Sequence, residues 1–241
     1  MADRTPQASP LFYARIAGLL YLFIIIFGVS SEVLIRSGLI VPGNAAATAS
    51  NILASQGLFR MGFAADSIMF LCDVGLAVLL FILLKPVSKP LALAALFFRL
   101  TQTAVIAVNL LNYHAAMLLL TRPGYASAFE PSQLHALTSM FLDLHAHGYD
   151  LGLIPFGVHC VILGYLIVKS LYIPKTLGIL MMAGGVTYLV GSYTRFLFPE
   201  YVAAVSPIYI VALVSESALC LWLLIKGVNS QTTIKEVCHE V

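Results

Sequence analysis

Six apolar stretches, each long enough to form a helix that crosses a bilayer, run through this sequence. A helix needs about 20 consecutive, mostly apolar residues to cross the hydrocarbon layer. We place the stretches at residues 12–35, 59–84, 91–119, 139–168, 177–198 and 207–225. Backbone polar groups must be paired inside a bilayer, so such stretches form helices. The sequence therefore predicts an all-α, polytopic membrane protein built as a bundle of six transmembrane helices.

The composition supports the same class of protein. Of 241 residues, 60% are hydrophobic and only 10% are charged, whereas soluble domains have about 45–50% and about 25%. We therefore expect the lipid bilayer to surround the chain. A net charge of +2, with the basic residues spread along the chain, argues against a nucleic-acid partner. No polar linker is long enough to separate domains, so we expect residues 1–241 to form a single transmembrane domain.

The basic residues at the helix ends predict the orientation of the chain, because loops rich in Lys and Arg stay in the cytoplasm. One set of helix ends contains Arg4, Arg15, Lys85, Lys89, Lys169, Lys175, Lys226 and Lys235. The opposite set contains fewer: Arg36, Arg60, Arg122 and Arg195. This imbalance predicts that both termini lie in the cytoplasm.

Two segments between the apolar stretches have features of their own. Residues 44–56 are rich in alanine, which predicts a short helix at the outer interface. Pro131 and Ser132 are typical of a helix start. A helix from Ser132 to Val168 would be ~55 Å long at 1.5 Å per residue, too long to cross upright. Either its first turns lie along the interface or Pro155 bends it.

Ionisable residues lie at one matched depth inside four of the apolar stretches. Counted from the basic residues at the helix ends, each lies about 15–18 Å into the bilayer, near its midplane. Such groups are costly in hydrocarbon and usually face the interior of a bundle. Two further polar residues follow on one face of the third stretch. The predicted polar core, a candidate binding site, consists of Asp73, Arg99, Gln102, Asn109, His159 and Glu216.

A second polar layer is expected nearer the outer surface. We assign to it Glu32, Arg60, Asp66, His145, Tyr149, Asp150 and Arg195. Asp150 does not share a helix face with His159. Either a bend at Pro155 brings these two residues together, or Asp150 pairs with a neighbour such as Arg195.

The chemistry of the polar core has several interpretations. Asp73 and Arg99 could simply form a buried ion pair. Asp73, His159 and Glu216 are the candidates for a divalent metal, since imidazole and carboxylate groups are ordinary zinc ligands. However, Arg99 would compete for the carboxylates, and neither HExxH nor HxxxH spacing occurs, so we predict no metal. No motif for a nucleotide or a catalytic serine stands out, which leaves the cofactor and any catalytic residues unknown.

Several runs also resemble a known family. They are LFRMGFAAD (58–66), LCD (71–73), FRLTQ (98–102), LHAHGYDLG (144–152), GVH (157–159) and LWLL (221–224). Together they resemble a bacterial integral-membrane family catalogued as domain of unknown function DUF4386, over about residues 13–227. The resemblance implies a multi-pass protein of the bacterial cytoplasmic (inner) membrane, and it implies no activity.

Three kinds of function therefore remain open. The polar core could bind or move a small polar solute or protons, with His159 as a proton carrier because its ordinary pKa is near neutrality. Alternatively, the protein could be an intramembrane hydrolase, with or without a metal, that acts on an apolar substrate. Thirdly, it could be a structural or regulatory subunit of the membrane. Six helices are few for a monomeric carrier, so a homo-oligomer is a reasonable expectation.

Overall fold

The computed structural model describes residues 9–228, so the basic residues Arg4 and Lys235 lie outside the described residues. Within that range the chain is helical and contains no strand. Six helical spans are long and apolar enough to cross a membrane, namely Pro10–Leu39, Gln56–Leu84, Lys89–Thr121, Pro131–Lys169, Lys175–Leu197 and Pro199–Ile225. The predicted all-α bundle of six membrane-spanning helices is confirmed.

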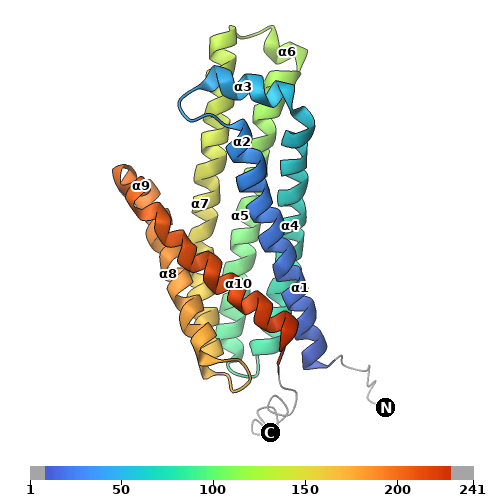
Figure 1. The fold of residues 1–241 in the computed structure, drawn as a ribbon, viewed down its shortest axis with the longest axis vertical. Coiled ribbons are helices and arrows are strands. Elements are labelled where there is room, and N and C mark those ends of the chain that lie inside the picture. Colours follow the sequence, from blue (N-terminus) through green and yellow to red (C-terminus); the bar gives the residue numbers. More distant parts are fainter. Residues whose placement is uncertain (1–8, 229–241) are drawn as a thin grey trace. The chain divides into compact units, whose positions relative to one another are not determined.

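Some spans contain more than one element (Figure 1). In chain order the elements are α1 (Pro10–Val29), η1 (Ser30–Arg36), α2 (Ser37–Leu39), α3 (Ala45–Ala54), α4 (Gln56–Leu84), α5 (Lys89–Thr121), α6 (Pro123–Ala126), α7 (Pro131–Lys169), α8 (Lys175–Leu197), η2 (Pro199–Tyr201), α9 (Val202–Val205), η3 (Ser206–Ile208) and α10 (Tyr209–Ile225). The helix predicted between residues 44 and 56 is α3, and the Asn44 side chain caps it by accepting a hydrogen bond from the Ala47 backbone N–H at 3.0 Å.

The longest helix is α7, with 39 residues and Pro155 inside it. At 1.5 Å per residue it is about 58 Å long, well beyond the roughly 30 Å of a hydrocarbon core. Part of α7 therefore extends beyond the hydrocarbon layer, or the helix is strongly tilted.

The chain separates into two compact units, which we describe individually. Of the described residues, the first unit contains 9–22, 72–102 and 153–228, and the second contains Phe23–Leu71 and Thr103–Gly152. The boundaries fall inside α1, α4, α5 and α7. The single-domain organisation therefore stays a prediction.

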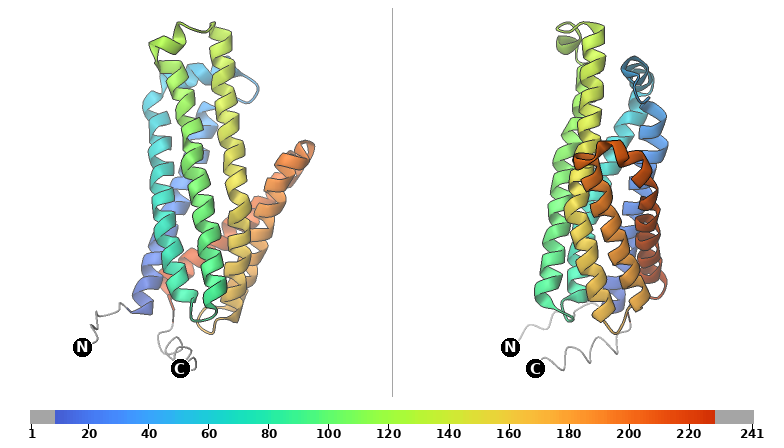
Figure 2. Two further views of the ribbon diagram at one scale, coloured as in Figure 1. Left: turned by 180° about the vertical axis from the view of Figure 1, so that it is seen from behind. Right: turned by 90° about the vertical axis from the view of Figure 1, so that its left-hand side faces the viewer.

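In the first unit, α7 and α8 approach closely because glycines face each other. A Cβ atom on Gly157 would lie 2.8 Å from the Gly185 carbonyl oxygen, and one on Gly185 would lie 2.6 Å from the Gly157 carbonyl oxygen. Any side chain at either position would push the two backbones apart. On its other side α8 packs along α10, and Figure 2 shows both helices from two further directions.

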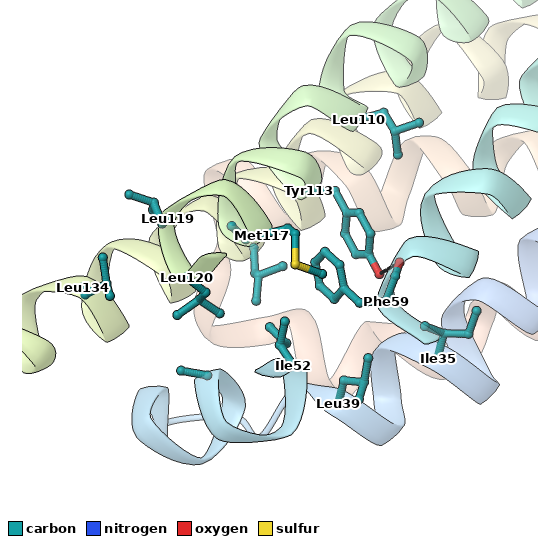
Figure 3. Packing of buried hydrophobic residues seen from close by; sticks show 13 residues of the cluster. Ile35, Leu39, Ile52, Phe59, Leu110, Tyr113, Met117, Leu119, Leu120 and Leu134 are labelled. Carbon is teal, nitrogen blue, oxygen red and sulfur yellow. Dashed lines mark hydrogen bonds between the residues drawn. The ribbon is translucent and has the colours of Figure 1, made fainter. Parts of the chain in front are cut away.

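The second unit has an apolar core in which α3, α4, α5 and α7 meet the end of the first span (Figure 3). Phe59 of α4 and Tyr113 of α5 stack with ring centroids 4.0 Å apart and an interplanar angle of 3°. The Tyr113 hydroxyl also donates a hydrogen bond to the Phe59 carbonyl oxygen at 3.0 Å. Ile52 places α3 against the same cluster. This combination of stacking and hydrogen bonding ties α4 firmly to α5.

Within the first span, residues Ser30–Arg36 form a π-helix. Its wider turn brings residues five apart onto one face, so Ser31 and Arg36 are both buried. The Arg36 Nη1 donates a hydrogen bond to Ser31 Oγ at 2.9 Å. An ideal α-helix would turn these two side chains away from each other.

Candidate functional site

Arg99 is the centre of the polar residues in the first unit. Its Nε donates to Asp73 Oδ1 at 2.9 Å, and its Nη2 forms an ion pair with the same oxygen at 2.5 Å. When the Gln102 amide is oriented to satisfy its neighbours, its nitrogen donates to Asp73 Oδ2 at 2.8 Å. Arg99 and Gln102 of α5 therefore bond both carboxylate oxygens of Asp73 on α4. With His159, these residues form what we call the charge cluster.

The surroundings of Arg99 are buried and aromatic. The residue is 0% exposed. Its guanidinium carbon lies 5.4 Å from the centre of the Tyr21 ring and 5.1 Å from that of Phe156, within the range of cation–π attraction. A buried charge persists only when it is paired and hydrogen-bonded. Asp73 pairs with Arg99, and His159 and Gln102 add hydrogen bonds to this pair, so the charge cluster satisfies this requirement.

His159 takes part as a neutral ring with a defined tautomer. Its Nδ1 lies 2.8 Å from the Ala95 carbonyl oxygen, which can only accept, so Nδ1 carries the proton. Its Nε2 lies 3.0 Å from Arg99 Nη1 and accepts from that donor. A second proton on Nε2 would place two cations in contact and break this hydrogen bond. The geometry therefore favours a fixed hydrogen-bonding role for His159 over proton transfer.

Glu216 belongs to the same unit but bonds elsewhere. The Tyr188 hydroxyl of α8 donates a short hydrogen bond to Glu216 Oε1. Glu216 is close enough to Arg99 for electrostatic interaction, yet the ion pairs of the described residues do not include it. It joins α10 to α8 and stands beside the charge cluster.

The predicted metal candidates do not assemble into a ligand set. Among residues 9–228, no three His, Cys, Asp or Glu side chains are grouped as metal ligands. Arg99 instead bonds both Asp73 and His159. The cavity that includes His159 has a volume of about 10 Å³, and a single water needs about 10–15 Å³. This cavity has no room for a solute larger than one water molecule.

Asn109, the remaining member of the predicted polar core, lies in the second unit. Its amide nitrogen donates to the His145 carbonyl oxygen of α7 at 2.7 Å, and the Asn112 amide donates to its Oδ1 at 3.0 Å. Gly148 makes room for this contact, because a Cβ there would collide with the Asn109 side chain. Asn109 therefore fastens α5 to α7.

The outer polar layer contains a cation that the sequence analysis did not assign to it. Arg36 is 7% exposed and forms an ion pair with Asp66 Oδ2 at 2.7 Å. Its Nε also donates to Glu32 Oε2 at 2.7 Å. The sequence does contain a signal for the ion pair of Arg36 with Glu32, since the two residues have the i, i+4 spacing of helical ion pairs. No comparable sequence pattern predicts the π-helix that turns Arg36 inward.

Two polar atoms of this layer are buried without a partner. Asp66 Oδ1 and His145 Nε2 have no hydrogen-bond partner among residues 9–228. Their residues are 1% and 3% exposed. An unsatisfied buried polar atom costs about 1–3 kcal/mol. These two atoms are therefore the unsatisfied hydrogen-bonding groups of this layer among the described residues.

The other members of the outer layer are dispersed. The Tyr149 hydroxyl approaches Met69 Sδ at 3.8 Å. Asp150 is buried in the second unit, whereas Arg195 is half-buried on α8 of the first unit. Their pairing stays a prediction. Arg60 is exposed and faces a different feature of the second unit, a cavity.

That cavity has a volume of about 780 Å³. It lies between α4 and α5, with Leu53 of α3 on one side. Its apolar wall includes Phe59, Tyr113 and Met117 of the packed core (Figure 3). Ligand pockets in proteins usually measure about 300–1,000 Å³ and are mainly apolar with a few polar groups. This cavity has both properties.

The rim of the cavity is basic. Arg60 of α4, His114 of α5 and Arg122 all line it, and all three are exposed. Phe63 and Leu53 on the same rim are 37% and 43% exposed. We call this feature the basic cavity. The sequence did not indicate it, because the pattern placed Arg60 in the outer polar layer, Arg122 entered only the charge balance of the loops, and His114 belonged to no predicted group.

Comparison with known proteins shows the family of this chain. A family model described as domain of unknown function (DUF4386) matches residues 16–227. The chain belongs to this family, and its six apolar helices make it a multi-pass membrane protein. An uncharacterized protein of Archaeoglobus fulgidus is 29% identical over 160 residues, which cover 66% of this chain and 80% of that protein. No solved structure matches the chain.

Proposed function

We propose that this membrane protein binds a small, partly apolar molecule in the basic cavity. The observation that carries the proposal is the cavity volume of about 780 Å³ within the second unit. Its wall is preorganised, because the Phe59–Tyr113 stack and the Tyr113 hydrogen bond hold α4 and α5 together without a ligand. A preorganised site loses little conformational entropy on binding.

Movement of a solute or protons through the polar core has less support. Arg99, Asp73 and His159 already bond one another, and the cavity that includes His159 holds one water at most. We propose instead that the charge cluster pairs α4, α5 and α7 within the first unit. The metal-dependent form of the hydrolase gains no support from the donor set, since no metal-ligand group occurs among the described residues.

Photolabelling of the full-length protein in nanodiscs tests the proposed function. The probe is a neutral alkanol that carries a diazirine, and the readout is labelling of peptides that contain residues 53–63 or 113–123. We expect labelling that saturates and that an unlabelled alkanol displaces. Leu118→Trp and Leu53→Trp, which both reduce the cavity, should lower this labelling several-fold.

A matched control comes from the lipid-facing side of the same helix. Leu111 of α5 is 65% exposed and does not line the cavity, so Leu111→Trp should leave the displaceable labelling unchanged. If all three tryptophan variants behave like the natural protein, the cavity binds nothing and the proposed function is wrong.

We further propose that both termini lie in the cytoplasm of a bacterial cell, as the Lys and Arg distribution indicates. Arg60 and Arg122 would then lie toward the outer side of the inner membrane. Reporter fusions to the C-terminus test this: a cytoplasm-active reporter should be active and a periplasm-active one silent.

The homo-oligomer expectation is checked by light scattering of the purified protein, and a monomer mass would overturn it.

A further inference from the structure

The two arginines on the rim of the basic cavity differ from the paired arginines of the bundle. Arg36 is bonded to Asp66 and Glu32, and Arg99 to Asp73. Arg60 and Arg122, in contrast, have no acidic partner among residues 9–228. Both nevertheless line the same cavity, one from α4 and the other from the residue that follows α5. Their guanidinium donors are therefore available for an external acceptor.

The chemistry of that acceptor follows from the guanidinium group. Arginine presents several N–H donors in a planar fork that matches the oxygens of phosphate, often in pairs. The other polar groups on the rim add donors without adding negative charge. These groups are His114 and Gln56. Thr121 also lines the cavity, but its hydroxyl already donates to the Met117 carbonyl oxygen at 2.7 Å. The rim thus selects an anionic head group.

The interior of the cavity is apolar, so it favours a ligand whose remaining part is apolar. Leu53 and Phe63 expose apolar surface to it, since they are 43% and 37% exposed, while the other apolar lining residues Phe59, Met117 and Leu120 are buried in the packed core. A free inorganic anion would leave this apolar surface uncovered. A hydrocarbon chain attached to the anion would cover it and gain about 25 cal/mol for each Å² of apolar surface removed from water.

We propose that the basic cavity binds an amphiphile with a phosphate head and a hydrocarbon chain, with Arg60 and Arg122 on the phosphate and the aromatic wall on the chain. This inference rests on the proposed function and adds the class of ligand. A volume of about 780 Å³ is that of a drug-sized pocket, so the head and the first part of a chain occupy it. Such a ligand is either a phospholipid of the bilayer or a soluble alkyl phosphate.

The test compares two diazirine probes of equal chain length on the full-length protein in nanodiscs of zwitterionic lipid. One probe is an alkyl phosphate and the other the neutral alkanol. We expect the alkyl phosphate to label residues 53–63 and 113–123 in preference to the alkanol. In the Arg60→Gln/Arg122→Gln variant this preference should fall about tenfold or more, because charge-assisted hydrogen bonds are the strong ones.

The matched control is Arg15→Gln, which removes an exposed arginine of the first unit and should retain the preference. If the double variant keeps the full preference for phosphate while Leu118→Trp still lowers labelling, the cavity binds ligands but the phosphate inference is wrong. If Leu118→Trp and Leu53→Trp lower no labelling, the proposed function itself fails. These two failures are therefore distinguishable.

A second arm identifies the source of the ligand. A diazirine on the acyl chain of phosphatidylglycerol, incorporated in the nanodisc, labels the cavity if the ligand is a bilayer lipid. Labelling by the added alkyl phosphate alone indicates a soluble amphiphile. Both results support the shared phosphate chemistry if the double arginine variant lowers them, and undiminished labelling of that variant by both phosphate-bearing probes overturns it.

Discussion

Arg99 in the charge cluster and Arg60 in the basic cavity carry the same chemical group in opposite settings. Arg99 is 0% exposed and bonded to Asp73 and His159. Arg60 is exposed, lines a cavity of about 780 Å³ and has no acidic partner among residues 9–228. The first arginine is fully paired inside the protein, and the second is open to a partner from outside.

The difference shows that a buried charge in a membrane protein is not by itself a sign of a binding site. A ligand for the charge cluster would have to displace partners that already compensate the desolvation of Arg99. A ligand for the basic cavity displaces only water or lipid. Stability should therefore depend mainly on the charge cluster, and binding mainly on the basic cavity.

The largest loss of stability is expected for Asp73→Ala, because it leaves Arg99 buried without its carboxylate. Breaking a buried ion pair costs about 3–5 kcal/mol. Thermal unfolding of the purified protein in detergent measures the loss. Replacing both partners, as in Asp73→Leu/Arg99→Met, should recover most of it. If Asp73→Ala unfolds at the natural temperature, the charge cluster does not stabilise the bundle and the contrast with the cavity disappears.

A smaller loss is expected for Asp66→Ala in the second unit. Arg36 keeps Glu32 and Ser31 as partners, and the substitution also removes the unpartnered Oδ1 of Asp66. We expect a loss of about 1–3 kcal/mol, near the cost of an unsatisfied buried group. Unfolding in the same detergent compares it with Asp73→Ala. A loss larger than that of Asp73→Ala would mean that Glu32 and Ser31 do not compensate Arg36 for the lost carboxylate.

Tyr188→Phe should destabilise the protein by about 1 kcal/mol, the net contribution of a typical hydrogen bond. The substitution removes the donor to Glu216 and keeps the aromatic ring beside Phe156, whose ring centroid is 5.2 Å away. The control is Tyr193→Phe on the same helix, since Tyr193 is 48% exposed. Equal unfolding temperatures for the two variants would show that the Tyr188–Glu216 bond adds nothing.

The smallest effect is expected for Glu32→Gln. The Glu32 side chain is 67% exposed, so its i, i+4 ion pair with Arg36 is screened by solvent. Exposed pairs contribute under about 1 kcal/mol, and the effect should shrink as salt is added. Unfolding at low and high ionic strength measures it. A loss as large as that of Asp66→Ala, unaffected by salt, would show that Glu32 is an essential partner of Arg36.

The six-helix architecture was predictable from the sequence because membrane solvation acts on long, uninterrupted runs of residues. The ends of the helices were harder to predict from the sequence. The first span ends at Leu39, beyond the apolar range of 12–35, whereas the start of α7 at Pro131 agrees with the helix start indicated by Pro131 and Ser132. Hydropathy marks the apolar part of a helix, whereas backbone hydrogen bonds continue the helix into more polar residues.

In the candidate site, Asp73, Arg99 and His159, which the sequence places at one depth, are buried and bonded to one another, because a charge in hydrocarbon has few alternatives to pairing. Which helix face meets which neighbour was decided only by the tertiary structure. The π-helix turned Arg36 toward Asp66, and packing of α3 against α4 and α5 left Arg60 at an open cavity. Helical periodicity specifies a face of one helix, but a cavity is a property of several helices that fail to fill the space between them.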